Sequence, residues 1–446
     1  MTTSKILAVG ILAGTALIST ASAVTPVKIY VTGSTAFRKA TVEAIGGTAG
    51  TAGGGVISGG AFATSGTTGL YVASDNSDLT SANLVNWFGG NIGGTLVTVK
   101  ASWSGSTGGV QTVAAGSSSI KVKFLLDSAS GTANADIRVS GVDGSTCEAA
   151  IPDIGLADSL QSSTPFNGTF SGVTYQSLNA TKVGVVGFVF AGSNGFPSGL
   201  SMTKKSFEYQ FAGLGYVPLS VYNGDATDAL AATRFAYAVG RDPDSGTRTQ
   251  TLAETAYGVN NAVTQFKPTV SAGHITALGN YADTTINGIT YAGANMGESS
   301  GGTLRGFLTN VMDSSAYQNG EAGPSYLVTY LGISDFLKVY TGTIGGLTGS
   351  YSGGAPATPL AWNGVTYSQA NIMNGSYTFW GYEYVTSRSD LGNGTSGGPA
   401  VKGAFGTNLA NGILATATSG LGGNVKLSDL QVTRSGDGGP ITNNNF

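Results

Sequence analysis

The feature that most constrains this chain is an uninterrupted apolar run at residues 182–191, KVGVVGFVFA. The run has no polar alternation and is rich in β-branched and aromatic residues, which favours a buried strand over a helix. A continuous run of this kind is typical of a strand in a sheet that is buried on both faces. Further strand-like segments (residues 27–31, 96–101, 235–239, 326–333 and 374–385) alternate with helix-like segments, so the predicted fold class is α/β with mostly parallel sheets.

One of these strands ends in a turn that carries much of the chain's polar chemistry. Residues 235–239 are apolar, and Arg241-Asp-Pro-Asp-Ser-Gly-Thr247 follows directly. A helix is expected from Ser245, and the first amides of a helix have no internal partners and lie at the positive end of its dipole. Gly246 permits close approach to the backbone, and Arg241 adds a planar cationic fork. These donors predict an oxyanion ligand such as phosphate; an N-cap serine with solvated charges around it is the alternative.

Other turns have the same character. The strand at residues 27–31 gives way to an expected helix at Thr35, Ala36 and Phe37. A glycine-rich turn after residues 96–101 contains Ser106, and a short apolar segment ends at Asp158. In α/β sheets, ligands gather at the carboxyl ends of strands. The turns are therefore expected to meet, although an N-cap is the alternative role for Asp158.

Composition narrows the class of protein. Charged residues are only 10% of the 446, Gly accounts for 71, and the net charge is −3. This balance argues against a nucleic-acid surface. The chain has a single cysteine, Cys147, and a single histidine, His274. These counts argue against Ser-His or Cys-His hydrolases and against zinc sites built from several cysteine or histidine ligands. Neither a cofactor nor a metal is expected.

The first 23 residues are typical of a secretory signal. Lys5 precedes the apolar residues 6–18, and Ala21-Ser-Ala23 is a cleavage motif that would leave Val24 at the new N-terminus. An uncleaved membrane anchor is the alternative, but the run is short for a bilayer. The protein is therefore expected to be exported, to a periplasm or the extracellular space. The tail after Val432 is polar and is expected to fray.

The turns resemble, in residues and in order, those of the PstS-like phosphate-binding proteins of ABC importers, which have the type II periplasmic-binding-protein fold. The matching blocks are Thr32-Gly-Ser-Thr-Ala-Phe37, Gly105-Ser-Thr-Gly-Gly-Val110, Asp153-Ile-Gly-Leu-Ala-Asp158 and Arg241-x-x-x-Ser-Gly-Thr247, and the last is the most specific. The resemblance implies two α/β lobes with the ligand between them: residues 24–189 plus 376–446 as lobe I, and residues 190–375 as lobe II.

The resemblance also implies roles for individual residues. The phosphate ligands would be Thr35, Ala36, Phe37, Ser106, Asp158, Arg241, Ser245, Gly246 and Thr247. Asp158 would accept the proton that phosphate retains near neutral pH and sulfate lacks, which favours phosphate. The implied role is a monomeric, non-enzymatic solute-binding protein that delivers inorganic phosphate to an ABC permease in the inner membrane.

The chain departs from the family pattern at two places. Ala36 replaces the threonine that usually precedes Phe37, and Pro243 replaces an aspartate that usually follows the arginine by two residues. The second change puts the anchoring of Arg241 in question. Glycine-, serine- and threonine-rich additions lie near residues 46–90, 111–150 and 341–370, and a hairpin between residues 120–124 and 135–139 is expected within the second.

Two alternatives stay open at this point. An exported structural or surface protein could keep the fold without a ligand, which the low charge and abundant glycine favour. A phosphatase would require an activated nucleophile or metals, for which the sequence offers no obvious candidate.

Overall fold

The computed structural model describes residues 24–46, 55–58, 71–73, 83–116, 120–127, 147–225, 227–416 and 423–443. The proposed signal segment at residues 1–23 and most of the glycine-rich stretches at 46–90 and 111–150 lie outside the described residues. Among the described residues, no helix has the length and apolarity needed to cross a bilayer.

The helices and strands are bounded as follows. The helices are α1 Arg38–Gly46, α2 Ser106–Ala115, α3 Lys204–Phe207, α4 Ser220–Asn223, α5 Gly246–Glu254, α6 Gly301–Phe307, α7 Ile333–Phe336, α8 Gln369–Met373 and α9 Gly398–Thr416. The strands of the large sheet are β1 Val27–Gly33, β2 Tyr71–Ala73, β3 Leu84–Ile92, β4 Thr95–Ser102, β7 Ile154–Ala157, β10 Leu178–Gly192, β11 Ser201–Met202, β12 Tyr216–Pro218, β13 Phe235–Ala238, β19 Tyr326–Gly332, β22 Thr358–Trp362 and β23 Trp380–Arg388.

Smaller sheets and hairpins decorate this frame. They comprise β5 Val122–Leu125 with β6 Cys147–Ala150, β8 Gly168–Phe170 with β9 Val173–Tyr175, β14 Lys267–Ser271 with β15 His274–Gly279 and β18 Val311–Met312, β16 Thr284–Ile286 with β17 Ile289–Tyr291, β20 Thr343–Ile344 with β21 Leu347–Thr348, and β24 Val432–Arg434 with β25 Ile441–Asn443.

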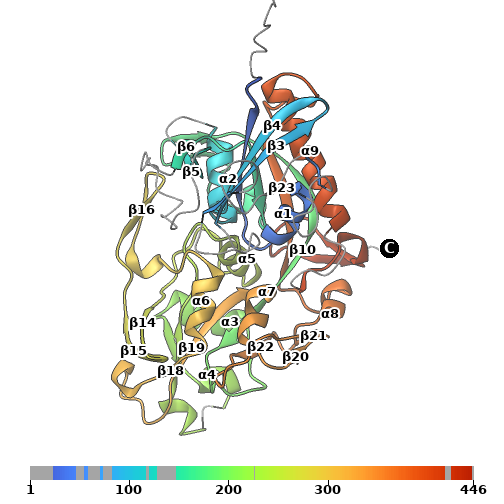
Figure 1. Ribbon diagram of the computed structural model, residues 1–446. Helices are drawn as coiled ribbons and strands as arrows, with labels where there is room; N and C mark the ends of the chain where they lie inside the picture. The colour runs from blue at the N-terminus through green and yellow to red at the C-terminus, as the bar shows by residue number, and fades with distance from the viewer. Residues whose placement is uncertain are drawn as a thin grey trace, which may run out of the picture.

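The large sheet is divided between an upper and a lower lobe (Figure 1). In the upper lobe β7, β1 and β4 are parallel neighbours, with β23 and β3 added antiparallel at the two sides. In the lower lobe β13 and β19 are parallel, with β12 antiparallel beside β13. The prediction of a two-lobed α/β fold is therefore confirmed, with parallel strands at the centre of each lobe and antiparallel strands at the flanks.

The apolar run that dominates the sequence becomes β10, which crosses from one lobe to the other. In the upper lobe, β10 pairs with β23 through residues 178–187. In the lower lobe, it pairs with β19 through residues 188–192 and with β22 through residues 190–192. Residues 183–192 are all buried. A strand covered on both faces along this length explains why the run has no polar alternation.

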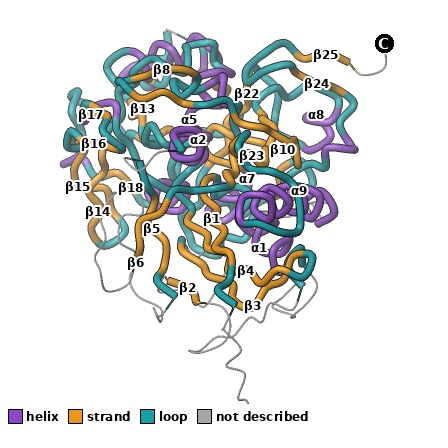
Figure 2. The backbone as a smooth tube through the Cα atoms, turned by 90° about the horizontal axis from the view of Figure 1, so that it is seen from above, coloured by secondary structure: helices purple, strands orange, loops and turns teal. Residues whose placement is uncertain are grey.

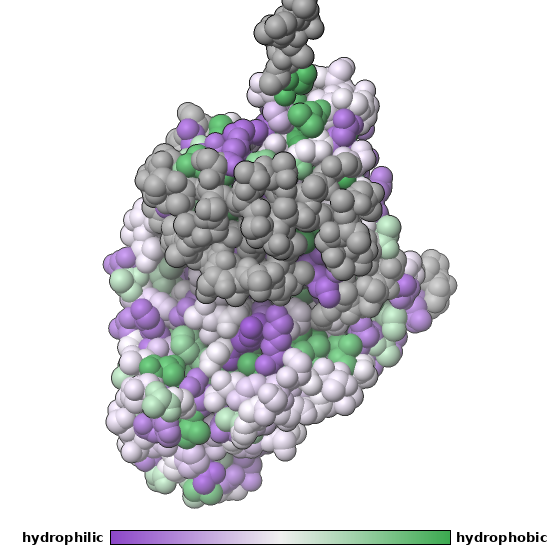
Figure 3. Space-filling model, in the orientation of Figure 1, coloured by the Kyte–Doolittle hydropathy of each residue, from purple (hydrophilic) through white to green (hydrophobic). Residues whose placement is uncertain are grey.

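Helices cover both faces of the upper sheet. α1 and α9 pack together on one face and α2 lies on the other, directly above α5 of the lower lobe (Figures 1 and 2). On the face of the lower lobe shown in Figure 3, weakly polar residues form much of the surface, in keeping with the 10% of charged residues in the chain.

One local prediction falls partly outside the described residues, and another is wrong. β5 pairs with β6, and residues 135–139, the expected partner of residues 120–124, lie outside the described residues. The tail does not fray at residues 432–443, where β24 and β25 pair and the Arg434 side chain is buried. Arg434 forms an ion pair of 3.2 Å with Glu254 at the end of α5 and lies over the ring of Trp380, so the tail is fixed between the lobes.

Candidate functional site

The turn after β13 has the predicted form, with a polar loop that leads into the first turn of α5. Ser245 is the N-cap, and its Oγ accepts a hydrogen bond of 3.3 Å from the Arg248 amide. Gly246 and Thr247 open the helix, and the side chains of this turn are buried, with Thr247 7% exposed. An N-cap and a ligand site are therefore compatible here, because Ser245 satisfies only one of the amides at the helix start.

Two other predicted residues lie against this turn. Ser106 begins α2, and its Oγ accepts a hydrogen bond of 3.3 Å from the Asp158 amide at the end of β7. A Cβ added at Gly246 would lie 1.5 Å from Oδ1 of Asp158 and 2.6 Å from Oγ of Ser106. A side chain at this position would therefore displace Asp158 and Ser106. Ser106, Asp158 and Gly246, which are far apart in the sequence, are hereafter called the polar cluster.

Arg241 is buried on the lower-lobe side of the cluster. Its Nε and Nη2 donate to the carbonyl oxygens of Glu298 and Ser299 at 3.0 and 2.9 Å. These carbonyls orient the guanidinium, which answers the question raised by Pro243. A guanidinium has five N–H donors, so these two bonds do not use all of them. The charge of Arg241 acts on Asp158 and favours its ionised form.

The three predicted residues at the start of α1 have a different environment. Ser34 caps this turn by accepting from the Ala36 amide at 3.1 Å, and Thr35 and Ala36 are partly exposed. Phe37 is buried in the core, where its ring lies against Gly184 of β10. Among the described hydrogen bonds, none joins Thr35, Ala36 or Phe37 to the polar cluster.

Hydrogen bonds from α2 and β7 to the lower lobe hold the cluster closed. The amides of Thr107 and Gly108, at the start of α2, both donate to the Asp244 carbonyl oxygen, at 3.0 and 3.2 Å. The hydroxyls of Thr107 and Thr249 are 2.9 Å apart. The carbonyl of Asp244 thus caps a helix of the opposite lobe, using amides that sequence reasoning had left available for an anion.

Gln250 adds a bond that sequence reasoning missed. Its Nε2 donates to the carbonyl oxygen of Asp158 at 2.5 Å. The signal was present, because residues four apart lie on the same face of a helix and Gln250 follows Gly246 by four.

The carboxylates around the cluster are buried and strongly perturbed. Burial raises the pKa of Asp158 to about 6, while the Ser106 hydroxyl and the Arg241 charge oppose the rise. Burial, reinforced by the charge of Asp158, raises the pKa of Glu383 on β23 well above its usual value. Glu383 accepts from Ser34 Oγ at 3.3 Å through one oxygen. Sequence reasoning missed Glu383, although a lone acid inside an aromatic strand is an unusual residue to bury.

Each of these two acids has an oxygen without a partner. Oδ1 of Asp158 and Oε1 of Glu383 are buried, and neither has a hydrogen-bond partner among the described residues. Buried polar oxygens normally have one. The cluster is therefore short of donors on its acidic side. Within the part of the chain that the structure describes, no group of three or more His, Cys, Asp or Glu side chains could hold a metal ion.

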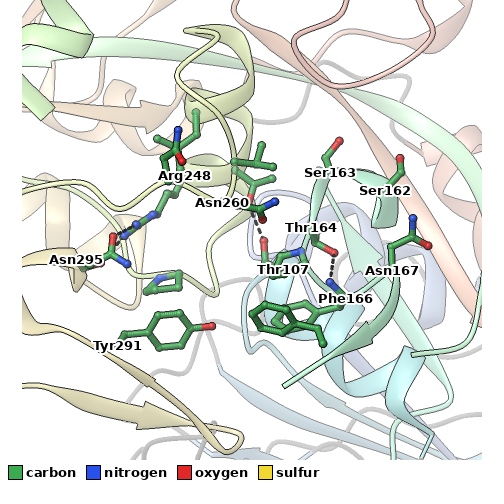
Figure 4. Close-up of a pocket in the computed structure, with 17 residues that line it drawn as sticks. Thr107, Ser162, Ser163, Thr164, Phe166, Asn167, Arg248, Asn260, Tyr291 and Asn295 are labelled. Carbon is green, nitrogen blue, oxygen red and sulfur yellow. Dashed lines mark hydrogen bonds between the residues drawn. The ribbon is translucent and has the colours of Figure 1, made fainter. Parts of the chain in front are cut away.

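A cavity of about 520 Å³ opens beside the cluster, between the lobes (Figure 4). Upper-lobe residues at 162–167 form one wall, and Arg248, Asn260, Tyr291 and Asn295 of the lower lobe form the other. Thr107 borders both the cavity and the cluster, because it follows Ser106 on α2. Ser106, Asp158 and Gly246 themselves do not line the cavity.

No protein-family model matches the chain, and no curated protein matches it. Several solved structures match the chain. One is a candidate phosphate ABC transporter substrate-binding protein from Clostridium perfringens with bound phosphate, which is 10% identical with a TM-score of 0.40. The match covers 90% of this chain and 99% of that chain.

Two further structures are of the same kind. A phosphate-binding protein from Stenotrophomonas maltophilia is 10% identical, with a TM-score of 0.37 and coverage of 87% of this chain and 83% of that chain. PstS from Borrelia burgdorferi is 10% identical, with a TM-score of 0.35 and coverage of 90% and 98%. The chain is similar over most of its length to solved phosphate-binding proteins.

Proposed function

We propose that this protein binds inorganic phosphate, or a closely related tetrahedral oxyanion, between its two lobes. The observation that carries the proposal is the convergence of the start of α2, the end of β7 and the start of α5 on Gly246, where Asp158 Oδ1 and Ser106 Oγ lie within 2.6 Å of the position that a Cβ would take. A glycine at a helix N-terminus beside a serine hydroxyl is a favourable place for an oxyanion. Arg241 supplies a positive charge from the lower lobe.

Asp158 would set the choice of anion. An ionised carboxylate beside a fully deprotonated anion is unfavourable, whereas a protonated phosphate oxygen can donate to Oδ1, which has no other partner among the described residues. Sulfate has no proton to give near neutral pH. Sites that leave a buried polar group unpaired discriminate by roughly 10⁴-fold.

The remaining assignments follow from this role. We propose Ser106, Asp158, Arg241, Ser245, Gly246 and Thr247 as the main ligands, and Thr35, Ala36 and Phe37 as residues that approach the anion only if the lobes rearrange. Lobe I would comprise residues 24–189 and 376–446, lobe II residues 190–375, with β10 and the chain before β23 as the connections. Closure of such lobes on a ligand is a hinge motion.

The cellular role we propose is that of an exported, monomeric, non-enzymatic receptor that delivers its ligand to an ABC permease. The signal-like first 23 residues and the net charge of −3 support export and argue against nucleic-acid binding. The only histidine, His274, is exposed and paired with Asp313 away from the cluster, which gives no support to a histidine-activated nucleophile.

One observation favours the alternative of a structural protein without a ligand. Asp158 Oδ1 lies directly against Gly246, and the carbonyl of Asp244 occupies the α2 amides, so the lobes are closed on each other by the chain's own groups. A protein that needs no anion would have its cluster filled in this way.

Thermal unfolding in increasing phosphate separates these functions. A phosphate receptor gains stability with the logarithm of the phosphate concentration, while equal concentrations of sulfate have little effect. Ser106→Ala should reduce the gain, and Ser177→Ala, on the exposed surface, is the matched control. A melting temperature that does not respond to phosphate would favour the structural alternative.

A further inference from the structure

The cavity beside the polar cluster is larger than phosphate requires. Its volume of about 520 Å³ falls within the range of roughly 300–1,000 Å³ found for sites that bind organic ligands. A tetrahedral oxyanion has only five heavy atoms. The cavity therefore has room for a substituent that inorganic phosphate does not carry.

Apart from Arg248, the polar side chains that line the cavity are neutral. Ser162, Ser163 and Asn167 line one side of it and Asn260 and Tyr291 the other, and its 17 lining residues include no Asp, Glu, Lys or His. Hydroxyls and amides both donate and accept hydrogen bonds, so they complement the hydroxyl groups of a ligand better than its charges.

The one charged residue in the lining is already engaged. Nη1 of Arg248 donates to the carbonyl oxygens of Asn295 and Arg241, at 2.6 and 3.2 Å, and Nη2 donates to the Asn295 side chain. The guanidinium fixes the lower wall of the cavity. It is poorly placed to pair with a charged substituent.

Aromatic side chains give the cavity flat apolar surfaces. Phe166 and Phe170 lie 6.0 Å apart in an edge-to-face arrangement on the upper side. Tyr291, from the β16–β17 hairpin, directs its hydroxyl toward Phe166 from the other side (Figure 4). Neutral hydrogen-bonding groups combined with aromatic faces suit a small ring that has both hydroxyl groups and C–H faces.

The hairpin that contributes Tyr291 reaches the upper lobe. Asn287 at its tip donates to the Gln111 side chain on α2 at 2.9 Å, and Ile289 packs against the apolar cluster that contains Phe166. The hairpin therefore links the two lobes beside the cavity.

The cavity and the polar cluster are adjacent along both helices. On α2, Ser106 belongs to the cluster and Thr107 to the cavity; on α5, Gly246 belongs to the cluster, and Arg248 and Thr249 to the cavity. The two hydroxyls at the boundary, on Thr107 and Thr249, bond to each other at 2.9 Å. A ligand whose anionic group is at the cluster would carry its substituent into the cavity.

We propose that the preferred ligand is a phosphate monoester with a neutral, polyhydroxylated substituent of about the size of a monosaccharide. This proposal depends on the proposed function, because it assigns the phosphoryl group to the polar cluster. It adds that the cavity, not the cluster, determines which phosphate compound is selected.

Calorimetric titration with glucose 6-phosphate, inorganic phosphate and glucose tests the proposal. The ester is expected to bind at least about tenfold more tightly than phosphate, which is what one or two additional hydrogen bonds would give. Glucose alone should bind much more weakly than the ester. If phosphate binds and the ester binds no more tightly, this inference is wrong and the proposed function stands; if neither binds, both are wrong.

Substitutions on the two walls locate the effect. Asn167 and Asn260 are exposed, so Asn167→Leu and Asn260→Leu together should leave the fold intact. The double variant should lose the preference for the ester, while Asn179→Leu, an exposed position on β10, should keep it. A double variant with an unchanged preference would overturn the proposal.

Discussion

The starts of α5 and α1 look alike in sequence but differ in what surrounds them. Each follows a buried strand, and each has a serine that accepts a backbone hydrogen bond, Ser245 in one case and Ser34 in the other. At α5, Gly246 contacts two residues from the opposite lobe. At α1, Phe37 turns into the core of its own lobe, against Gly184. A polar helix start therefore indicates a cap, and it becomes a candidate site only when donors from another segment converge on it.

The largest expected effect comes from filling the contact at Gly246. Gly246→Val would place atoms where Asp158 and Ser106 now lie, and overpacking of this kind costs about 1–3 kcal/mol. Phosphate affinity should fall by up to about 100-fold, which corresponds to the upper end of that range. Ala36→Val, at the start of α1, is the comparison variant and should lower the affinity less, because no described hydrogen bond joins Ala36 to the polar cluster. Equal losses in the two variants, measured by calorimetry, would remove the distinction between the two helix starts.

The next prediction concerns pH. The pKa of Asp158 is about 6 in the folded protein against an ordinary value of 3.8, so the folded state holds more protons than the unfolded state between these values. The free energy of unfolding should therefore decrease as the pH rises from about 4 to about 6, by up to about 3 kcal/mol from this residue. Asp158→Asn should remove that part of the decrease.

The measurement is chemical denaturation across this pH range in a phosphate-free buffer. Glu383 and Asp437 also have raised pKa values because they are buried, so the variant should keep a smaller slope of the same sign. A variant with the same slope as the natural protein would show that Asp158 does not titrate as a buried acid.

A smaller effect is expected from the hairpin that joins the lobes. Asn287→Gly removes the bond to Gln111 and keeps the positive φ of 48° that this position requires. Loss of one such bond costs about 0.5–1.5 kcal/mol, so phosphate affinity should fall by about two- to tenfold if binding requires closed lobes. Asn363→Gly, also at φ 48° but distant from the cavity, is the control. Identical affinities for the two variants would mean that the hairpin does not contribute to closure.

The smallest effect is expected at Thr35. Its side chain is partly exposed, and among the described hydrogen bonds none joins it to the polar cluster. Thr35→Ala should therefore change the phosphate affinity less than Ser106→Ala does, in the same titration. A larger effect at Thr35 would show that the start of α1 moves onto the anion when ligand binds.

The sequence predicted the frame of the molecule well. The uninterrupted apolar run at residues 182–191 led to the crossing strand β10, and the polar turns after β7 and β13 and at the start of α2 were predicted to meet. These features are local or follow from the rule that parallel strands end at one edge. The contact of Gly246 with Ser106 and Asp158 requires, in addition, that the two lobes dock.

The features that were missed depend on contacts between distant segments. Three of these contacts are made by backbone groups, which carry no sequence signal. They are the hydrogen bonds from the α2 amides to the Asp244 carbonyl, the bonds from Arg241 to backbone carbonyls, and the pairing of β5 with β6. The ordered tail is similar: Arg434 is buried because Glu254 and Trp380 meet it between the lobes. Polar composition alone predicted that this segment would fray.

The central claim is that the polar cluster binds one phosphate. The most direct measurement is a calorimetric titration, near pH 7, of the chain beginning at Val24, first with phosphate and then with sulfate. We predict saturable binding of one phosphate per chain, with sulfate weaker by a factor that approaches 10⁴, as expected on the order of magnitude for an unpaired buried acid. Absence of binding heat with phosphate, or equal affinity for the two anions, would contradict the account.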